Sequence, residues 1–101
     1  MARWHHRGMS TEITDAPDRS RYEIREGDAL AGFAEYRTQP GQIVVTHTEV
    51  DPAFGGRGIG GALMRGLLDD VRAKGLTVVP LCPFAKKWID GHPDYQDLVA
   101  P

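Results

Sequence analysis

Residues 50–63 read VDPAFGGRGIGGAL, a segment in which a strand ends, a glycine-rich turn follows and a helix begins. Proline at position 52 cannot continue the hydrogen-bond ladder of a strand, so the strand ends there. Five glycines then fall within seven residues, at positions 55, 56, 58, 60 and 61. Glycine has no Cβ atom, so such a cluster lets the backbone come close to another group. The segment therefore predicts a binding turn between a strand and a helix N-terminus.

Downstream of the glycines, apolar residues recur with a helical period, and the helix is predicted to have Lys74 in its last turn and Gly75 just past its end. A short apolar strand is predicted over residues 77–81 and a second helix over residues 84–90. Residues 92–95 are expected to form a turn, after which the chain packs back on the sheet. The apolar stripe of the first helix consists of Leu63, Met64, Leu67, Leu68 and Val71.

Upstream of the turn, apolar and polar residues alternate over residues 21–25 and again over residues 30–36, which predicts a hairpin. A third strand is predicted over residues 43–50, where β-branched residues dominate. Residues 1–20 are polar and lack periodicity, so we expect a poorly ordered lead to a single domain over residues 21–101. The predicted fold is α/β (α+β) in the order β-β-β-α-β-α, and it opens with an antiparallel meander.

Composition excludes several classes of protein. The chain has 101 residues, 41% of them hydrophobic, and a formal net charge of −2, which argues against phosphate-driven binding of nucleic acid. No apolar run approaches the ~18 residues of a membrane span. The single cysteine, Cys82, favours a reducing compartment, the cytoplasm. Cys82 and the histidines lack metal-ligand spacing, so no metal is expected. The edges of so small a sheet are compatible with a monomer or a homodimer.

The glycine cluster at a helix N-terminus predicts a phosphate site, because free N–H groups and the helix dipole attract anions. A P-loop is excluded, since Gly61 and Ala62 stand where lysine and serine or threonine belong. Gly56, Gly58 and Gly61 match a dinucleotide fingerprint literally, but the next strand does not end on the acid that this fingerprint requires. A tight turn whose glycines serve packing remains an alternative.

The same loop resembles the acetyl-CoA-binding segment of the GNAT superfamily of N-acetyltransferases. That family's loop reads Gln/Arg-x-x-Gly-x-Gly/Ala. Gly58 and Gly60 fill its last two positions, whereas Gly55 stands in place of the usual Gln or Arg. The loop by itself is a moderately specific signal.

Three further segments are similar to the minimal YjdJ-type branch of that superfamily. They are HTEV at residues 47–50, PLCPF at residues 80–84 and HPDY at residues 92–95. With them the resemblance covers residues 21–99. Two elements that help to form the acceptor site in larger members are missing, namely a helical pair between the first two strands and a final strand pair.

The resemblance implies a compact GNAT-like fold in which the strand ending at Val50 and the strand over residues 77–81 are parallel and splay apart. Acetyl-CoA would be the cosubstrate, with its pantetheine arm in that gap and its pyrophosphate on the helix N-terminus. The acceptor would be an unidentified amine of a small molecule or a protein. A non-catalytic module that binds CoA or acyl-CoA is the alternative. The implied cofactor contacts are Val50, Arg57, Gly58, Ile59, Gly60, Gly61 and Ala62.

Acetyl transfer to an amine requires a base, because an ammonium group is not a nucleophile. Glu49 is the first candidate, since many family members place a carboxylate at the end of this strand. Strand alternation predicts that Val45, His47 and Glu49 share one face. If that face points to the acceptor, His47 and Glu49 could relay a proton together; the alternative is that they form a solvated polar face.

Two further residues are candidates for proton donation to the leaving thiolate. Cys82 lies just past the fourth predicted strand, where it could accept the acetyl group, act as an acid or simply pack in the core. The tyrosine acid that is usual in the family is missing near residues 88–89. Tyr95 could replace it, or could anchor the C-terminal segment through a bonded hydroxyl.

Overall fold

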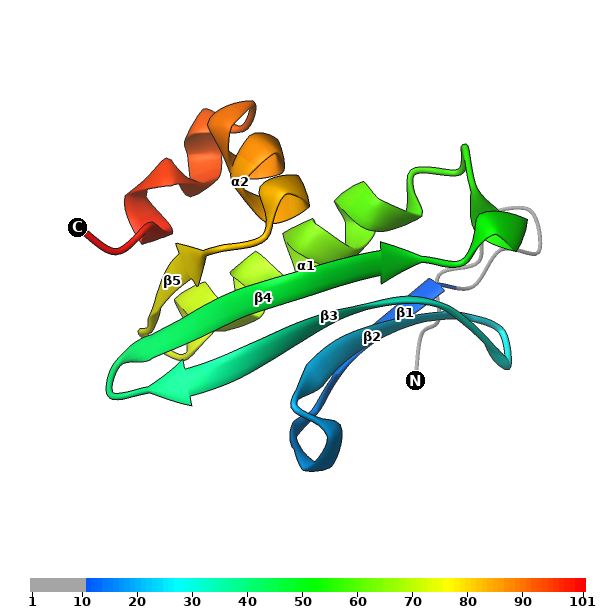
Figure 1. Ribbon diagram of the computed structural model, residues 1–101, viewed down its shortest axis with the longest axis horizontal. Coiled ribbons are helices and arrows are strands. Elements are labelled where there is room, and N and C mark those ends of the chain that lie inside the picture. The colour runs from blue at the N-terminus through cyan, green and yellow to red at the C-terminus, as the bar shows by residue number, and fades with distance from the viewer. Residues whose placement is uncertain (1–10) are drawn as a thin grey trace.

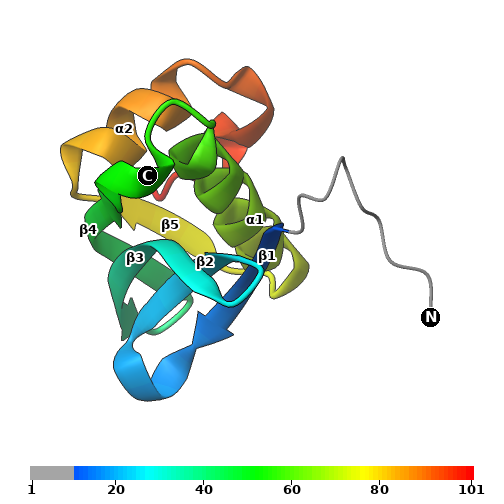
Figure 2. The same ribbon diagram turned by 90° about the vertical axis from the view of Figure 1, so that its right-hand side faces the viewer.

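The computed structural model describes residues 11–101, which form one five-stranded sheet with both α-helices on the same face (Figures 1 and 2). The strand order is β1-β2-β3-β4-β5, and the first four strands are antiparallel neighbours. β4 and β5 are parallel and are joined by α1 as a crossover. The bounds are β1 Thr11–Ala16, β2 Arg21–Glu26, β3 Ala29–Gln39, β4 Gln42–Val50, α1 Ile59–Ala73, β5 Thr77–Pro80 and α2 Pro83–Asp90.

The first strand, β1, corrects the predicted order. It pairs antiparallel with β2, and Ile13 packs against α1 at Gly66, where a Cβ atom would lie 2.8 Å from Ile13 Cδ1. The prediction of a poorly ordered lead is therefore wrong for residues 11–20, and residues 1–10 lie outside the described part. The segment is short and mostly exposed, so its place depends on partners distant in sequence rather than on a periodicity of its own.

The hydrophobic core lies between α1 and the sheet. The predicted helical stripe is confirmed, because each of its five members is at most 1% exposed. Tyr22 and Ile24 of β2 meet this stripe from the sheet side. The C-terminal 3-10 helix over Pro93–Leu98 closes the other side of α1 with Tyr95 and Leu98.

β4 and β5 separate after Val45, as the resemblance implies. β5 ends at Pro80 opposite Val45, and the N–H groups of Leu81 and Cys82 both donate to the Val45 carbonyl oxygen, at 3.0 and 3.2 Å. The chain then turns into α2, while β4 continues to Val50 paired only with β3 on its other side. This divergence leaves one edge of β4 open near the start of α1.

The carboxylate of Glu23 in β2 is buried on the side of the sheet opposite the two described α-helices. Glu23 is 2% exposed and accepts hydrogen bonds from three guanidinium groups, those of Arg19, Arg21 and Arg25. These bonds, that from Arg19 above all, lower the pKa of Glu23 to about 2 although burial opposes the shift.

Glu23→Gln is expected to lower the free energy of unfolding at pH 7 by about 2 kcal/mol, because the ionised carboxylate is stabilised in the folded state. A lowered pKa stabilises the fold above the unfolded value of 4.5 and is lost as pH falls toward 2. Urea unfolding should therefore show the gap between variant and wild type shrinking by half or more between pH 7 and pH 3. Glu35→Gln, at an exposed carboxylate of β3, is the control. A gap that does not change with pH would contradict this account.

Candidate functional site

The N-terminus of α1 presents free backbone donors. Its N-cap, Gly58, has a left-handed φ of 73° and offers no side chain to cap the helix. The first helical hydrogen bond runs from the Ala62 N–H to the Gly58 oxygen at 3.0 Å. The N–H groups of Ile59, Gly60 and Gly61 therefore precede the helical ladder and are available to an anion.

The glycines of this loop serve two different purposes. Gly56 and Gly58 adopt positive φ angles of 77° and 73°, which side chains rarely allow. Gly60 and Gly61 make room for α2 instead. A Cβ atom at Gly60 would lie 2.6 Å from Phe84 Cζ, and one at Gly61 would lie 3.2 Å from Trp88 Nε1. Packing therefore explains two of the five glycines, Gly60 and Gly61, and the elements that pack there are the helices α1 and α2.

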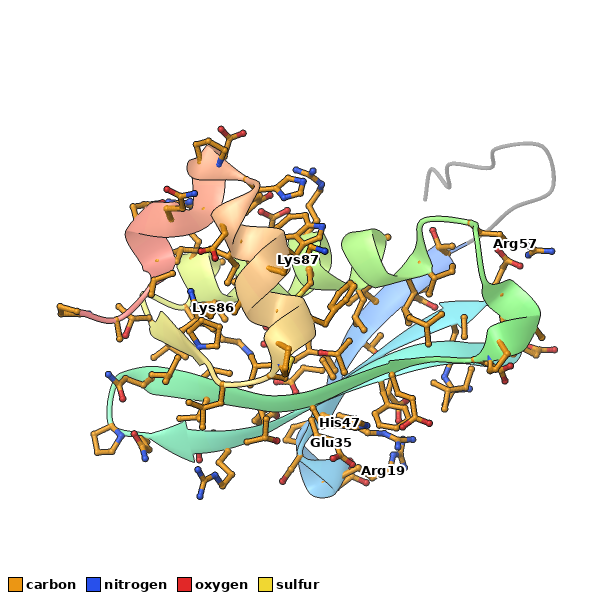
Figure 3. All side chains as sticks on the ribbon, turned by 45° about the horizontal axis from the view of Figure 1, so that its top comes forward. Arg19, Glu35, His47, Arg57, Lys86 and Lys87 are labelled. Atoms are coloured by element: carbon orange, nitrogen blue, oxygen red, sulfur yellow. The ribbon has the colours of Figure 1, made fainter. Side chains whose placement is uncertain are left out.

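Arg57 does not lie over these free donors. Its guanidinium forms an ion pair with Glu26 and lies 5.4 Å from the centroid of the Phe54 ring. Figure 3 shows its side chain at the outer edge of the loop. The structure therefore places Arg57 beside the β2–β3 hairpin rather than over the start of α1.

The open edge of β4 carries backbone groups that lack a strand partner. The Asp51 N–H donates to the Ala31 oxygen of β3 at 2.8 Å. Because an antiparallel ladder alternates, the backbone groups of Glu49 face β3, whereas those of Thr48 and Val50 face the side of β5. Within residues 11–101, no strand lies beside them there, since β5 ends opposite Val45. Val50 thus lies at the open edge of β4, in the gap where the sequence prediction placed it. Thr48 lies at the same edge and was not among the predicted residues.

Cys82 lies at the mouth of the gap between β4 and β5. Its Sγ is 3.3 Å from the Thr48 Oγ1 of β4 and caps α2 by accepting the Ala85 N–H, also at 3.3 Å. The side chain is buried, with 4% of the residue exposed. The structure thus brings Cys82 next to the open edge and also gives it a structural task as a helix cap.

His47 and Glu49 are brought together, as predicted, but on the opposite face of the sheet from Val45. The His47 Nε2 is 2.9 Å from the Glu49 Oε1, and both side chains are more than half exposed. Glu35 lies opposite His47 while Tyr36 lies opposite Val45, so Thr46 forms a β-bulge. The bulge reverses the alternation, which is why Val45 is in the core and the prediction of one shared face is wrong.

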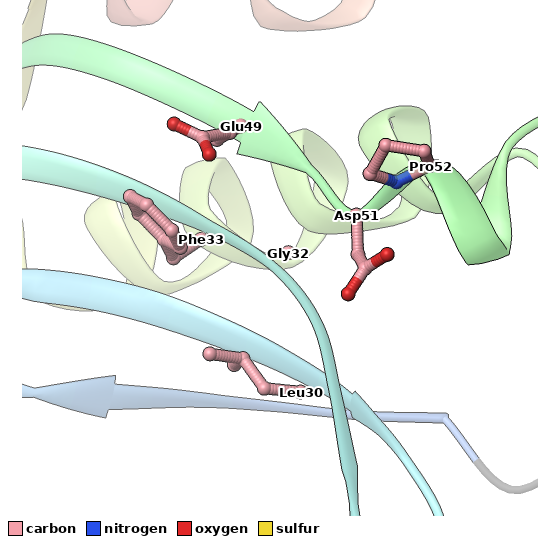
Figure 4. A pocket seen from close by; sticks show the side chains of 6 residues that line it. All are labelled: Leu30, Gly32, Phe33, Glu49, Asp51 and Pro52. Carbon is pink, nitrogen blue, oxygen red and sulfur yellow. The ribbon is translucent and has the colours of Figure 1, made fainter.

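Glu49 also borders a shallow hollow of about 180 Å³ at the end of β3 and β4 (Figure 4). Gly32 forms part of its wall through its backbone, and a Cβ atom there would lie only 2.7 Å from the Glu49 carbonyl oxygen. No sequence pattern marks Gly32, because this contact depends on the register of β3 and β4. The hollow is lined by Leu30, Gly32, Phe33, Glu49, Asp51 and Pro52.

Tyr95 is not brought to the gap. Its hydroxyl donates to Asp69 Oδ1 at 2.8 Å and accepts from Arg65 at 3.4 Å, so it contacts the outer surface of α1. Burial, together with the Asp69 carboxylate, raises the pKa of Tyr95, which makes the phenol a poorer acid. This position matches the anchoring alternative rather than the acid.

Gly32→Ala is expected to displace the backbone at Glu49 and to lower the free energy of unfolding by about 1–3 kcal/mol, because the added Cβ meets backbone that cannot rotate away. Urea unfolding measures the loss, and amide chemical shifts of residues 48–50 report the displacement. Gly91→Ala is the matched control, since a Cβ there would meet nothing closer than 3.7 Å. Equal effects of the two variants would contradict the proposed close contact.

Two kinds of feature are absent from the part of the chain that the structure describes. Among residues 11–101, no group of three histidine, cysteine, aspartate or glutamate side chains is arranged to hold a metal ion. In the same part of the chain, no helix combines the length and the apolarity that crossing a membrane requires.

Comparison with known proteins places this geometry in a family. Among solved structures, a GCN5-like protein from Staphylococcus aureus superposes with a TM-score of 0.69 at 25% identity, over 88% of this chain and 87% of that one. The ribosomal-protein alanine N-acetyltransferase of Escherichia coli matches with a TM-score of 0.59 at 20% identity, over 70% of this chain and 49% of its own. No curated protein sequence matches significantly.

The family model described as GCN5-related N-acetyl-transferase matches residues 21–98, which include β2 to β5, both α-helices and the glycine loop. This match covers most of the chain. It includes the two strands that diverge and the uncapped start of α1. The chain therefore belongs to the family of GCN5-related N-acetyltransferases.

Proposed function

We propose that this protein binds acetyl-CoA and transfers the acetyl group to a primary amine of a small molecule or a protein, as a member of the minimal YjdJ-type branch. One observation carries the proposal. The open edge of β4 at Thr48 and Val50 is joined by the glycine loop, residues 51–58, to the uncapped N-terminus of α1. The amide groups of the pantetheine arm of CoA can pair with the open edge of β4, and the pyrophosphate attached to that arm can bind the N-terminus of α1.

The residues that would hold acetyl-CoA form one continuous path. Thr48 and Val50 supply strand N–H and C=O groups for the pantetheine amides. Ile59, Gly60 and Gly61 supply N–H groups to the pyrophosphate, and the left-handed Gly58 keeps side chains out of that cradle. Arg57 would have to leave Glu26 to take part.

When bound, acetyl-CoA supplies an activated thioester. The acceptor nitrogen forms a bond to the acetyl carbon while the bond from that carbon to sulfur breaks. Glu49 is the proposed base that takes the proton from the ammonium group, and His47 at 2.9 Å passes this proton to solvent. The departing thiolate takes up a proton to leave as free CoA.

Cys82 is the proposed donor of that second proton, because its sulfur lies at the open edge of β4 beside Thr48. Its cap on α2 is the structural alternative, and Cys82→Ser separates the two by keeping a polar cap atom. Tyr95 is left with the anchoring role, since its hydroxyl is engaged on α1.

A module that binds CoA without turnover is the second candidate. The hollow beside Glu49 is shallow, and within residues 11–101 no α-helix covers that face of the sheet (Figures 1 and 4). If this hollow binds the acceptor amine too weakly, the protein would bind CoA without transferring the acetyl group. For either role we propose a cytoplasmic location, where a lone cysteine stays reduced.

Cofactor binding is tested by thermal unfolding with acetyl-CoA, CoA, NAD and ATP at equal concentration. We expect CoA and acetyl-CoA alone to raise Tm, by about 10–20 °C at ~100 times Kd, because ligands that bind only the folded state stabilise it by mass action. No shift with either would contradict the proposal, and an equal or larger shift with NAD or ATP would support a nucleotide site instead.

The base is tested with Glu49→Gln on the best acceptor found in a panel of primary amines, with release of CoA thiol as the measure. We expect kcat/KM to fall about 100-fold while the Kd of acetyl-CoA stays unchanged, because only proton removal is lost. Glu35→Gln is the matched control, since Glu35 is an exposed carboxylate opposite His47 in the register. A rate that is unchanged in Glu49→Gln would exclude the base role.

A further inference from the structure

The face of the sheet opposite α1 and α2, here called the far face, carries a row of three residues from neighbouring strands. Glu49 of β4 lies opposite Phe33 of β3, and Phe33 lies opposite Glu23 of β2. Neighbouring strands are about 4.8 Å apart, so the two carboxylate residues stand ~10 Å apart along this row. The partly buried Phe33 lies between them.

The Glu49 end of the row is acidic. Two carboxylates, those of Glu49 and Asp51, line the hollow there, and none of its six lining residues is basic. The Asp51 Oδ1 accepts the Ala53 N–H at 2.9 Å, which fixes this carboxylate at the end of β4. Two carboxylates attract a protonated amine, so this end suits the nitrogen of an acceptor.

The Glu23 end of the row is basic and has free donors. Arg21 bonds Glu23 through Nε at 2.8 Å, and Arg25 bonds it through Nη2 at 3.1 Å. A guanidinium has five N–H donors, and the other donors of these two arginines have no hydrogen-bond partner within residues 11–101. Glu35 lies opposite Arg21 in the register but forms no ion pair with it. The same is true, within the described chain, of Glu12 opposite Arg25.

An apolar surface joins the two ends. The Arg21 Cζ lies 4.5 Å from the centroid of the Phe33 ring, and Arg25 lies opposite Leu30 in the register. Phe33 and Leu30 line the same hollow as Glu49 (Figure 4). Both arginines therefore adjoin a wall of this hollow. A ligand with an ammonium group at one end, methylene groups in the middle and an anion at the other end matches this order.

We propose that the acceptor is a primary amine that carries a carboxylate about six bonds from its nitrogen, with the nitrogen beside Glu49 and the carboxylate on Arg21 and Arg25. This inference rests on the proposed function, because it names the substrate class of the same acceptor site. Six bonds span about 7 Å, and the long arginine side chains can cover the remaining distance. Planar guanidinium groups match the geometry of a carboxylate, so the two arginines are specificity residues that take no part in proton transfer.

The test compares kcat/KM for 6-aminohexanoate and 6-aminohexanamide with acetyl-CoA, measured as release of CoA thiol. This pair differs only in the charge of the remote group. For wild type we expect a preference of about tenfold for the carboxylate, mostly through KM, because a group distant from the reacting nitrogen contributes uniform binding. For 4-aminobutanoate over 4-aminobutanamide we expect less than about threefold, because four bonds span only ~5 Å.

Three variants locate the preference. Arg21→Gln should reduce it to about twofold or less, and Arg25→Gln should reduce it about threefold without disturbing the stack of Arg21 on Phe33. Arg19→Gln is the matched control, because it also removes a donor to Glu23 but lies before β2, in the 3-10 helix Pro17–Arg19. Its preference should stay within about twofold of wild type. Urea unfolding checks that all three variants are folded.

The outcomes separate this inference from the function on which it rests. No preference in wild type, or equal reductions in Arg19→Gln and Arg21→Gln, would overturn the inference and leave the acetyl-transfer proposal standing. If neither amine is acetylated, amide chemical shifts of residues 21, 33 and 49 decide. Shifts with 6-aminohexanoate alone would support the carboxylate site and count against acetyl transfer. Equal shifts with the two ligands, or none, would overturn the inference.

Discussion

The carbonyl oxygen of Val45 accepts two backbone N–H groups, those of Leu81 and Cys82, and the arrangement of the site depends on this point. A regular parallel ladder would continue β5 alongside the end of β4. Here β5 stops at Pro80 and the chain turns into α2. The remainder of β4 therefore keeps backbone groups free, and α2 begins beside them with Cys82 as its cap. The open edge and the helix that borders it have one common origin.

The β-bulge at Thr46 determines which side chains meet. By reversing the alternation, it keeps Val45 in the core and directs Thr48 toward Cys82. The same reversal places His47 and Glu49 on the face opposite α1 and α2. One extra residue thus puts the candidate base and the candidate acid on opposite sides of β4. In the proposed reaction, acetyl-CoA in the gap between β4 and β5 and the acceptor amine beside Glu49 would then approach each other from the two faces of the sheet.

The glycine loop combines ligand binding with packing. Gly56 and Gly58 give the turn its left-handed conformation and leave α1 uncapped. Gly60 and Gly61 let Phe84 and Trp88 of α2 approach α1 closely. Both tasks require a missing Cβ atom, so the five glycines exceed what a turn alone needs. The close packing of α2 also brings the rings of Phe84 and Trp88 against the first turn of α1.

Periodic placement of apolar residues can be recognised in the sequence alone. The sequence by itself therefore determined β2 to β5, the buried stripe of α1 and the glycine-rich start of that helix. It also identified the pair His47 and Glu49, two residues apart on one strand. Only the tertiary structure decided the place of β1, because that short strand depends on β2 and on Gly66 of α1. The bulge at Thr46 and the engagement of Tyr95 on α1 likewise depend on residues far apart in sequence. Register and long-range contacts leave no periodic trace, and that is why these features appear only when the chain is folded.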